Sequence, residues 1–481
     1  MTDIRFGSAR GRWIIAAAVL GSGVAFLDGT VVNTALPAIR RSLHTSLAGQ
    51  QWVISGYLLT LGSLLVVGGS LGDLFGRRLV FQVGLIGFAV TSALCGLAPN
   101  IGVFVAARVL QGLAAAALVP GSLAMLSAVF HPDDRARAIG AWTGLASVST
   151  ALGPFLGGWL IDAVSWRWVF LINPPIALAA AVIAQRHVPE TRAGGARQPI
   201  DVPGAILLSF GLAGVVFALI EGPGGWNATT VAAGLAGVGC LASFMAVELR
   251  RAYPMVPLVL FRSRRFAGAN ATTFVLWGAM GAVFFLVAVH LQQDLHYSAL
   301  ESGAALLPVT VLMLLFAARS GAIGQRIGPR IPMTLGPLVV AAGFALLTRV
   351  RVGGHYATSV LPGVVVFGLG LVITVAPLTA TVLAAVDDRH AGVGSAINNA
   401  VARVASLLAV AVLPAAAGIT GDRMSLEHGF ARSMWICAGL AVVGAVVSFV
   451  SIRREPVGPE TVSARTAATD DRARVRAAAE P

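Results

Sequence analysis

Asp28 and Arg108 are the charged residues whose positions most need a chemical explanation, because each lies inside a long apolar stretch. Asp28 stands in VAFLDGTVVNTALPAI, residues 24–39, and Arg108 stands in AARVLQG. A charge at the centre of a bilayer costs about 2.5–3.5 kcal/mol even on a lenient scale, so such a residue is rarely without a role. Desolvation favours the neutral form of an aspartate, whereas a nearby guanidinium favours its charged form. A carboxyl between these influences can take up and release a proton.

Both residues lie at a similar depth in their predicted helices. At a rise of about 1.5 Å per residue, each side chain is roughly 10–14 Å below the outer surface. If the two helices are neighbours, Arg108 can balance the charge of Asp28, and we predict that this pair couples proton movement to conformational change. The alternative is a static ion pair, or a carboxylate that is satisfied by helix contacts.

A second candidate is the loop sequence GSLGDLFGRR, residues 69–78. Asp73 can face the positive end of a neighbouring helix, and the two arginines can pair with Asp133 or Asp134. A degenerate copy, GAIGQRIGPR, occurs at residues 321–330. The alternative is an ordinary tight turn. We predict a conformational latch made of Gly69, Gly72, Asp73, Gly76, Arg77 and Arg78.

A third candidate is the glycine-rich stretch TGLASVSTALGPFLGG, residues 143–158. Proline inside a helix removes a backbone hydrogen bond, and small residues open a groove for a neighbouring helix. We predict a hinge here, although glycine and proline are also simply frequent in membrane helices. The residues concerned are Gly153, Pro154, Gly157 and Gly158, with Gly140 and Gly144 as an earlier small-residue pair.

Several polar residues inside apolar stretches are predicted to line a cavity: Asn33, Gln111, Trp277, Asn398, Asn399 and Arg403. Arg403 lies deep enough to pair either with a substrate or with a proton acceptor, and the sequence leaves both open. Arg319 lies nearer a helix end, where a long side chain can reach the interface.

The elements that must position these residues are membrane helices. The chain has 481 residues, of which 57% are hydrophobic and only 11% are charged. A hydrocarbon core about 30 Å thick needs about 20 apolar residues per helix. Such runs predict an all-α integral membrane protein with fourteen spans: 13–37, 51–72, 79–97, 102–129, 137–161, 167–185, 203–220, 229–247, 267–291, 303–323, 332–348, 358–384, 392–419 and 432–452.

The distribution of arginine predicts the orientation. With the N-terminus inside, 20 arginines fall in inner segments and 7 in outer ones, so both termini should be cytoplasmic. The repeated loop sequences indicate two related bundles with two helices inserted between them. The predicted parts are a cytoplasmic N-terminus (1–12), a first six-helix bundle (13–185), a loop (186–202), two inserted helices (203–247), a loop (248–266), a second six-helix bundle (267–452) and a disordered cytoplasmic tail (453–481).

Other classes of function find little support in the sequence. The chain has 34 basic residues and none is lysine, so it has no phosphate-binding loop of the Walker type. We expect no cofactor and no metal site, because no cluster has metal-ligand spacing and the three cysteines lie in apolar runs. The formal charge of +13 is assigned to membrane edges, and no nucleic-acid partner is expected.

Taken together, the segments resemble the major facilitator superfamily, and within it the fourteen-helix drug:proton antiporter family. LDGTVVNTALPAI, GSLGDLFGRR, RVLQG, GPFLGG, WRWVFLINPPI and YSALESGAALLP all look typical of that family. The resemblance implies a monomeric two-bundle carrier of the cell membrane, which exports hydrophobic or amphipathic drugs by alternating access in exchange for protons.

The resemblance also assigns the proton role to Asp28 and the paired basic role to Arg108. The partners it implies are lipid, protons and a small apolar or amphipathic substrate. Ser149 stands where the family often has glycine, and the tenth helix carries no acid of the kind that accompanies export of divalent cations. The alternatives are a carrier of the same fold for a metabolite or siderophore, an integral membrane enzyme, and a sensor that does not transport.

Overall fold

The structure is a computed structural model that describes residues 4–192, 200–387, 391–419 and 426–452. Within these residues, fourteen helical segments are long and apolar enough to cross a membrane, which confirms the predicted all-α membrane architecture with fourteen spans. The tail at 453–481, predicted to be disordered, lies outside the described residues. We call the end of the molecule at which the first helix begins the N-terminal side, and the opposite end the far side.

Six spans form the first bundle, with one span made of two helices. Pro174 and Pro175 stand at the start of the second of these helices, where proline is best tolerated because its missing N–H is not needed. The bounds are α1 (Ala9–Leu43), α2 (Leu47–Phe75), α3 (Arg77–Leu97), α4 (Ile101–Val129), α5 (Pro132–Ala163), α6 (Trp168–Leu171) and α7 (Asn173–His187).

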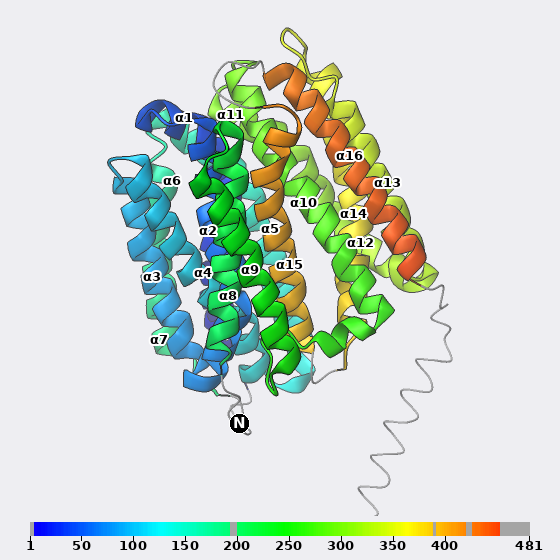
Figure 1. Ribbon diagram of the computed structural model, residues 1–481. Helices are drawn as coiled ribbons and strands as arrows, with labels where there is room; N and C mark the ends of the chain where they lie inside the picture. The colour runs from blue at the N-terminus through cyan, green and yellow to red at the C-terminus, as the bar shows by residue number, and fades with distance from the viewer. Residues whose placement is uncertain (1–3, 193–199, 388–390, 420–425, 453–481) are drawn as a thin grey trace, which may run out of the picture.

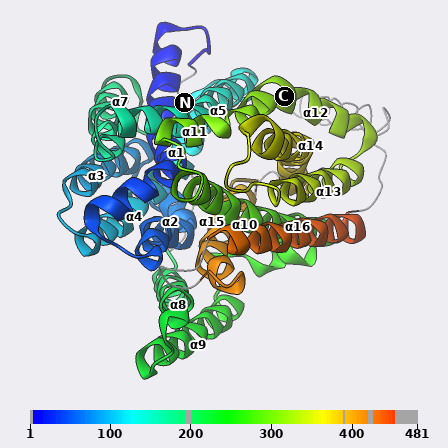
Figure 2. The ribbon, with the colours of Figure 1, turned by 90° about the horizontal axis from the view of Figure 1, so that it is seen from above.

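Two further helices follow, joined by a short 3-10 turn: α8 (Val202–Glu221), η1 (Gly222–Gly224) and α9 (Ala228–Arg250). Figures 1 and 2 place this hairpin outside the two bundles, with α8 against α2 and α15. Trp52 donates its indole N–H to Glu221 at 2.8 Å, and Ser209 donates to Ser63 at 2.9 Å. The inserted hairpin is therefore fastened to the first bundle through α8.

The second bundle repeats the six-span plan of the first. Its elements are η2 (Leu258–Arg262), α10 (Arg264–Gln293), α11 (Ala299–Ala305), α12 (Leu307–Ile327), α13 (Arg330–Leu347), η3 (Tyr356–Val360), α14 (Leu361–Ala384), α15 (Ala391–Ala416) and α16 (Leu426–Ser451). The predicted organisation of two six-helix bundles with two inserted helices is confirmed, and Figure 1 shows the bundles side by side.

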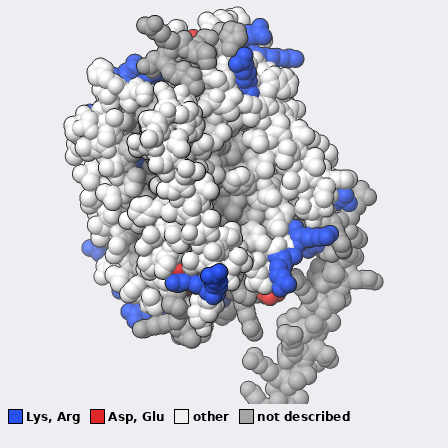
Figure 3. Space-filling view, in the orientation of Figure 1, with Lys and Arg blue, Asp and Glu red and all other residues white. Residues whose placement is uncertain are grey.

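Side-chain caps mark where many helices begin. Ser46, Asn100, Asp201, Asn227 and Ser263 each accept a hydrogen bond from a backbone N–H in the first turn of the following helix, which satisfies a group that the helix itself cannot. Charged side chains gather toward the two ends of the molecule, and Figure 3 shows a broad uncharged band between them. This band is the surface that a bilayer requires.

In the described chain the two bundles touch mainly along three pairs of helices, α1 with α10, α2 with α15, and α5 with α11, with smaller contacts of α1 with α11 and of α5 with α12. In each pair, one helix belongs to the first bundle and the other to the second. The residues that could do chemistry lie on the inner faces of these helices or one layer behind them. How the three pairs are joined therefore decides which end of the site is closed.

Candidate functional site

Asp28 and Arg108 form an ion pair at the centre of the first bundle. The Nη1 atom of Arg108 on α4 donates to Oδ2 of Asp28 on α1 at 2.6 Å. Asp28 has no exposed surface and Arg108 is 1% exposed. A buried pair of this kind is stable only if the remaining donors and acceptors also find partners, so the neighbours of the pair matter as much as the pair itself.

Gln111 completes the hydrogen-bond network. It accepts from Nη1 of Arg108 at 2.6 Å and donates to Oδ1 of Asp28 at 3.2 Å, while Nε of Arg108 donates to the carbonyl of Val53 at 3.1 Å. Gln111 is fully buried. The prediction that Gln111 lines a cavity is therefore wrong, because its one-turn spacing from Arg108 places it inside the ion-pair network.

Tyr57 on α2 covers the site, and nothing in the sequence pattern singled it out. Its ring lies 4.3 Å from the guanidinium carbon of Arg108, a cation–π distance, and its hydroxyl donates to the carbonyl of Ala25 at 3.4 Å. Phe170 lies on the guanidinium at 5.8 Å. Asp28 is thus sealed from solvent in this conformation, and a proton can reach it only after helices move.

Small residues explain how α2 and α4 come close enough to build this site. A Cβ on Gly112 would overlap the carbonyl of Tyr57, and one on Gly68 would overlap the carbonyl of Ala116. Thr60 of α2 adds a hydrogen bond to the carbonyl of Val109 at 2.7 Å. Close backbone approach through glycine is the usual way that membrane helices associate, and here it fixes Tyr57 beside Arg108.

The glycine-rich stretch of α5 makes contacts on two sides. Gly153 packs against Thr30, and Gly157 packs against Val31, both on α1. Gly158 instead faces α11 of the second bundle, where a Cβ would lie 2.5 Å from the carbonyl oxygen of Ala299. The predicted groove is therefore present at these three glycines.

Other expectations for α5 fare differently. Gly140 and Gly144 have no atom within 4 Å of the space a Cβ would occupy, so the groove predicted for them holds no neighbour among the described residues. The helix continues through Pro154, and bending there stays a prediction.

Among the described residues, the side chains of the predicted latch contact only the first bundle and the segment that follows α7. Arg77 donates to Asp73 at 2.8 Å and to the carbonyl of Ala124 at 3.3 Å. Arg78 forms an ion pair with Glu190 at 3.7 Å. The expected pairing of the arginines with Asp133 or Asp134 is wrong for this conformation, because nearer acceptors take their place.

The glycines of the latch have separate roles. Gly76 has a φ of +121°, a conformation that other residues adopt only with strain, and it separates α2 from α3. Gly69 faces Pro120, and Gly72 faces the backbone of Arg77. None of these contacts reaches the second bundle, so within the described chain the latch does not join the two bundles.

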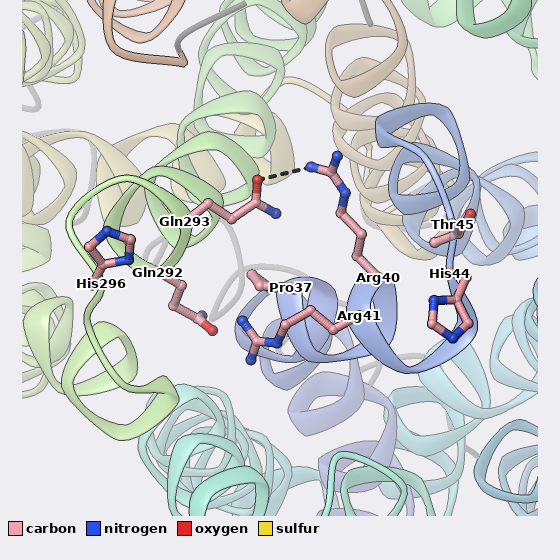
Figure 4. A pocket seen from close by; sticks show the side chains of 8 residues that line it. All are labelled: Pro37, Arg40, Arg41, His44, Thr45, Gln292, Gln293 and His296. Carbon is pink, nitrogen blue, oxygen red and sulfur yellow. Dashed lines mark hydrogen bonds between the residues drawn. The ribbon is translucent and has the colours of Figure 1, made fainter. Parts of the chain in front are cut away.

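Hydrogen bonds join the two bundles on the far side. Gln51 on α2 donates to the carbonyl of Val410 at 2.7 Å, and Gln292 on α10 donates to the carbonyl of Thr34 at 2.9 Å. Arg40 donates to Gln293 at 3.1 Å above a pocket between α1 and α10, which Figure 4 shows from close by.

Asp162 and the small residues of α11 close the third seam. The Asp162 carboxylate accepts from the backbone N–H groups of Ala299 at 3.2 Å and Leu300 at 2.8 Å, at the start of α11. A Cβ on Gly303 would overlap the carbonyl of Pro154. All three seams are therefore joined toward the far side.

The remaining predicted cavity residues differ in their surroundings. Asn33 is half-buried and makes only a 3.5 Å hydrogen bond to the carbonyl of Thr30. Asn398 is half-buried and donates to Asn270 and Thr273, which joins α15 to α10. Trp277 is half-buried between two apolar clusters.

Arg403 is half-buried and forms no ion pair or hydrogen bond with any described residue. Asn399, one helical turn away on the same face of α15, is exposed. Arg319 on α12 is also exposed and lies 5.9 Å from the ring of Phe316. Among the described residues, no group of three metal-ligating side chains comes together.

The chain is similar to known carriers over most of its length. The sequence profile of the Major Facilitator Superfamily matches residues 18–410. A tetracenomycin C resistance and export protein of Streptomyces glaucescens is 38% identical over 84% of this chain and 76% of its own. The puromycin resistance protein of Streptomyces alboniger is 34% identical over 94% and 93%, respectively. The crystal structure of the POT family transporter PepTSo has a TM-score of 0.66 at 15% identity, over 92% of this chain and 97% of that chain, which shows a shared fold.

Proposed function

Because this chain belongs to the Major Facilitator Superfamily, we propose that it exports hydrophobic or amphipathic drugs and antibiotics from the cytoplasm in exchange for protons. The names of its relatives support the cargo class, since they are resistance and export proteins for antibiotics. The single observation that carries the proton coupling is the sealed Asp28–Arg108 pair.

The geometry suggests how a proton at Asp28 can change the conformation. When Asp28 is ionised, it holds α1 to α4 through both Arg108 and Gln111. Protonation removes the negative charge, and Arg108 keeps only neutral partners: Gln111, the carbonyl of Val53 and the ring of Tyr57. The free energy that joins α1 to α4 falls, so these helices can shift relative to one another.

That shift has a route to the bundle interface. Thr30, two residues after Asp28, lies against Gly153 and donates to the carbonyl of Thr150 on α5 at 3.2 Å. The next turn of α5 carries Gly158, which touches α11 of the second bundle. Movement of α1 therefore reaches the far-side seam through α5. Alternating access follows if the far-side contacts break while the latch residues engage the second bundle.

The remaining parts of the proposal concern place and composition. We place both termini in the cytoplasm because the inner segments carry the arginine excess, and we place the chain in the cell membrane as a monomer surrounded by lipid. The proton gradient drives it, with no enzyme activity, cofactor or metal. Small apolar solutes, protons and lipids are the partners, and nucleic acid is not.

Everted membrane vesicles test this function. Their lumen is acidified by respiration, and antibiotics, dyes and biocides are added one at a time while lumenal pH is followed. Wild type should release protons on addition of an exported compound, and Asp28→Asn, present in equal amount, should not. Release that is the same in both would exclude Asp28 as the coupling residue. If no compound in the panel releases protons from vesicles that contain intact wild-type protein, export of a specific metabolite becomes the favoured function over export of drugs.

A further inference from the structure

Arg403 occupies a special place in the space between the bundles. It lies in the middle of α15, and a Cβ built on Gly62 of α2 would be 3.2 Å from the Cβ of Arg403. The hydrogen bonds and the glycine contact that join α2 to α15 in the described chain lie between this level and the far side. Arg403 thus lies on the N-terminal side of the hydrogen bonds that join α2 to α15.

The hydrogen bonds between α2 and α15 lie on the far side of Arg403. Asn399, one turn from Arg403 toward the N-terminal side, is exposed, whereas Val410, about two turns toward the far side, is buried and accepts from Gln51. The Cβ of Arg403 lies against Gly62 of α2, so its side chain begins at the contact between the bundles. A solute that enters between the bundles from the N-terminal side would therefore reach Arg403 at about the middle of α15.

The charge of Arg403 has no counter-ion among the residues that the structure describes. Apart from Asp28, every acidic residue in the described helices lies within a few residues of a helix end. Asp28 is already paired with Arg108, and the ring of Tyr57 covers that pair. An ionisable residue inside a membrane protein is a candidate functional site by default, and an unpaired guanidinium is a preferred partner for carboxylate.

The far-side pocket is lined by two arginines, Arg40 and Arg41, and by no acidic residue among those that line it. Figure 4 shows Arg40 and Gln293 pointing toward one another across the α1–α10 seam, which must part for a solute to leave. Arginines therefore lie both at mid-depth between the bundles and at the far-side pocket, and this arrangement favours a negatively charged solute.

We propose that Arg403 binds an acidic group, such as a carboxylate, of an amphipathic compound that this carrier exports. The proposal rests on the export function above and narrows its cargo to organic anions. It also excludes cationic drugs as preferred substrates, because an uncompensated guanidinium repels them.

Binding of a matched set of compounds tests this. Pyrenebutyric acid, its methyl ester and pyrenebutyl-trimethylammonium share one apolar part and differ in charge. Their dissociation constants are measured on purified protein in nanodiscs of zwitterionic lipid, which removes an anionic headgroup as a competing source of negative charge; protein-free nanodiscs serve as the blank. The variants are Arg403→Gln and Arg403→Lys, with Arg319→Gln as the matched loss of another intramembrane arginine.

We expect wild type to bind the acid at least about tenfold more tightly than the ester, which corresponds to about 1.4 kcal/mol, and the cation most weakly. Arg403→Gln should lose this preference while still binding the ester, which shows that it is folded. Arg403→Lys should keep part of the preference, and Arg319→Gln should keep all of it.

Several results would overturn the proposal. These are equal affinity of wild type for acid and ester, preference for the cation, no binding of any of the three, or an acid preference that survives in Arg403→Gln. Failure here leaves the proton-release experiment untouched, because that experiment uses uncharged and cationic compounds as well. Conversely, acid binding without proton release would refute proton coupling and not the site.

Discussion

Variants at Asp28 and Arg108 should separate the effect of the ion pair on the stability of the fold from its effect on proton coupling. Asp28→Asn keeps the size of the side chain but leaves Arg108, which is 1% exposed, without its counter-ion. Breaking a buried ion pair by removing one partner typically costs about 3–5 kcal/mol. Because Gln111, the Val53 carbonyl and the Tyr57 ring still contact the guanidinium, we expect the lower end, about 3 kcal/mol.

The double variant Asp28→Asn/Arg108→Met provides the decisive comparison. It removes both charges at similar volume, so most of the lost stability should return, since replacing a whole buried pair is often neutral. Unfolding in detergent should therefore rank Asp28→Asn below both wild type and the double variant. Neither variant should couple drug movement to protons, because each lacks the titrating carboxyl.

Two results would refute this reasoning. Equal stability of Asp28→Asn and the double variant would mean that the pair is not energetically coupled in the folded protein. Substrate-induced proton release by a stable Asp28→Asn would mean that another group carries the proton. The Arg108→Met single variant completes the cycle and gives the interaction free energy of the two side chains directly.

Other predictions concern the seams between the bundles and the ion-pair network. Gly303→Val should prevent far-side closure, because any Cβ at this position would overlap the Pro154 carbonyl. A cysteine placed at Ser298 should then label faster than in the same cysteine protein with Gly303 intact, and equal labelling would count against the seam. Asp162→Ala should shift the conformational equilibrium toward far-side opening by at most about 1 kcal/mol, since this carboxylate is exposed. The rate of labelling in the same assay should rise by up to about fivefold, and an unchanged rate would mean that the contact to α11 does not hold the far side closed. Gln111→Leu should leave the Asp28–Arg108 pair in place but remove the hydrogen bond to Oδ1 of Asp28, so stability should fall by about 1–3 kcal/mol and the pH dependence of transport should shift. Gln111→Asn, whose side chain is too short to reach both partners, should behave like Gln111→Leu. An unchanged pH profile in both variants would contradict the network.

The sequence was enough to predict the fourteen membrane helices because apolar length is a property of whole helices. The contacts of individual side chains inside the spans were harder to predict. The Asp28–Arg108 pairing followed from two charges at one depth, and the structure places them 2.6 Å apart. Tyr57 was not predicted because a lone tyrosine in an apolar run carries no periodic signal. The close packing of Gly112 against the backbone of α2 brings it to Arg108.

The latch shows a second limit of sequence reasoning. Arg77 and Arg78 lie near several carboxylates, and spacing along the chain cannot rank partners that come from different segments. Asp73, on the preceding turn, and Glu190, after α7, take those places. Gln111 was misassigned for a related reason, because a polar residue in a membrane helix can face either a cavity or a buried charge. Which face it occupies depends on helix rotation, which the sequence does not specify.

Proton-driven transport in proteoliposomes is the most direct test of proton coupling through Asp28. Purified protein is reconstituted in one orientation with an artificial pH gradient and no nucleotide, and movement of a compound identified in the vesicle panel is followed beside Asp28→Asn. We predict that wild type moves the compound uphill, against the direction of proton flow, and that this movement stops when nigericin collapses the gradient. Asp28→Asn should show no uphill movement. Uphill movement that persists without the gradient, or that Asp28→Asn sustains equally, would contradict this prediction.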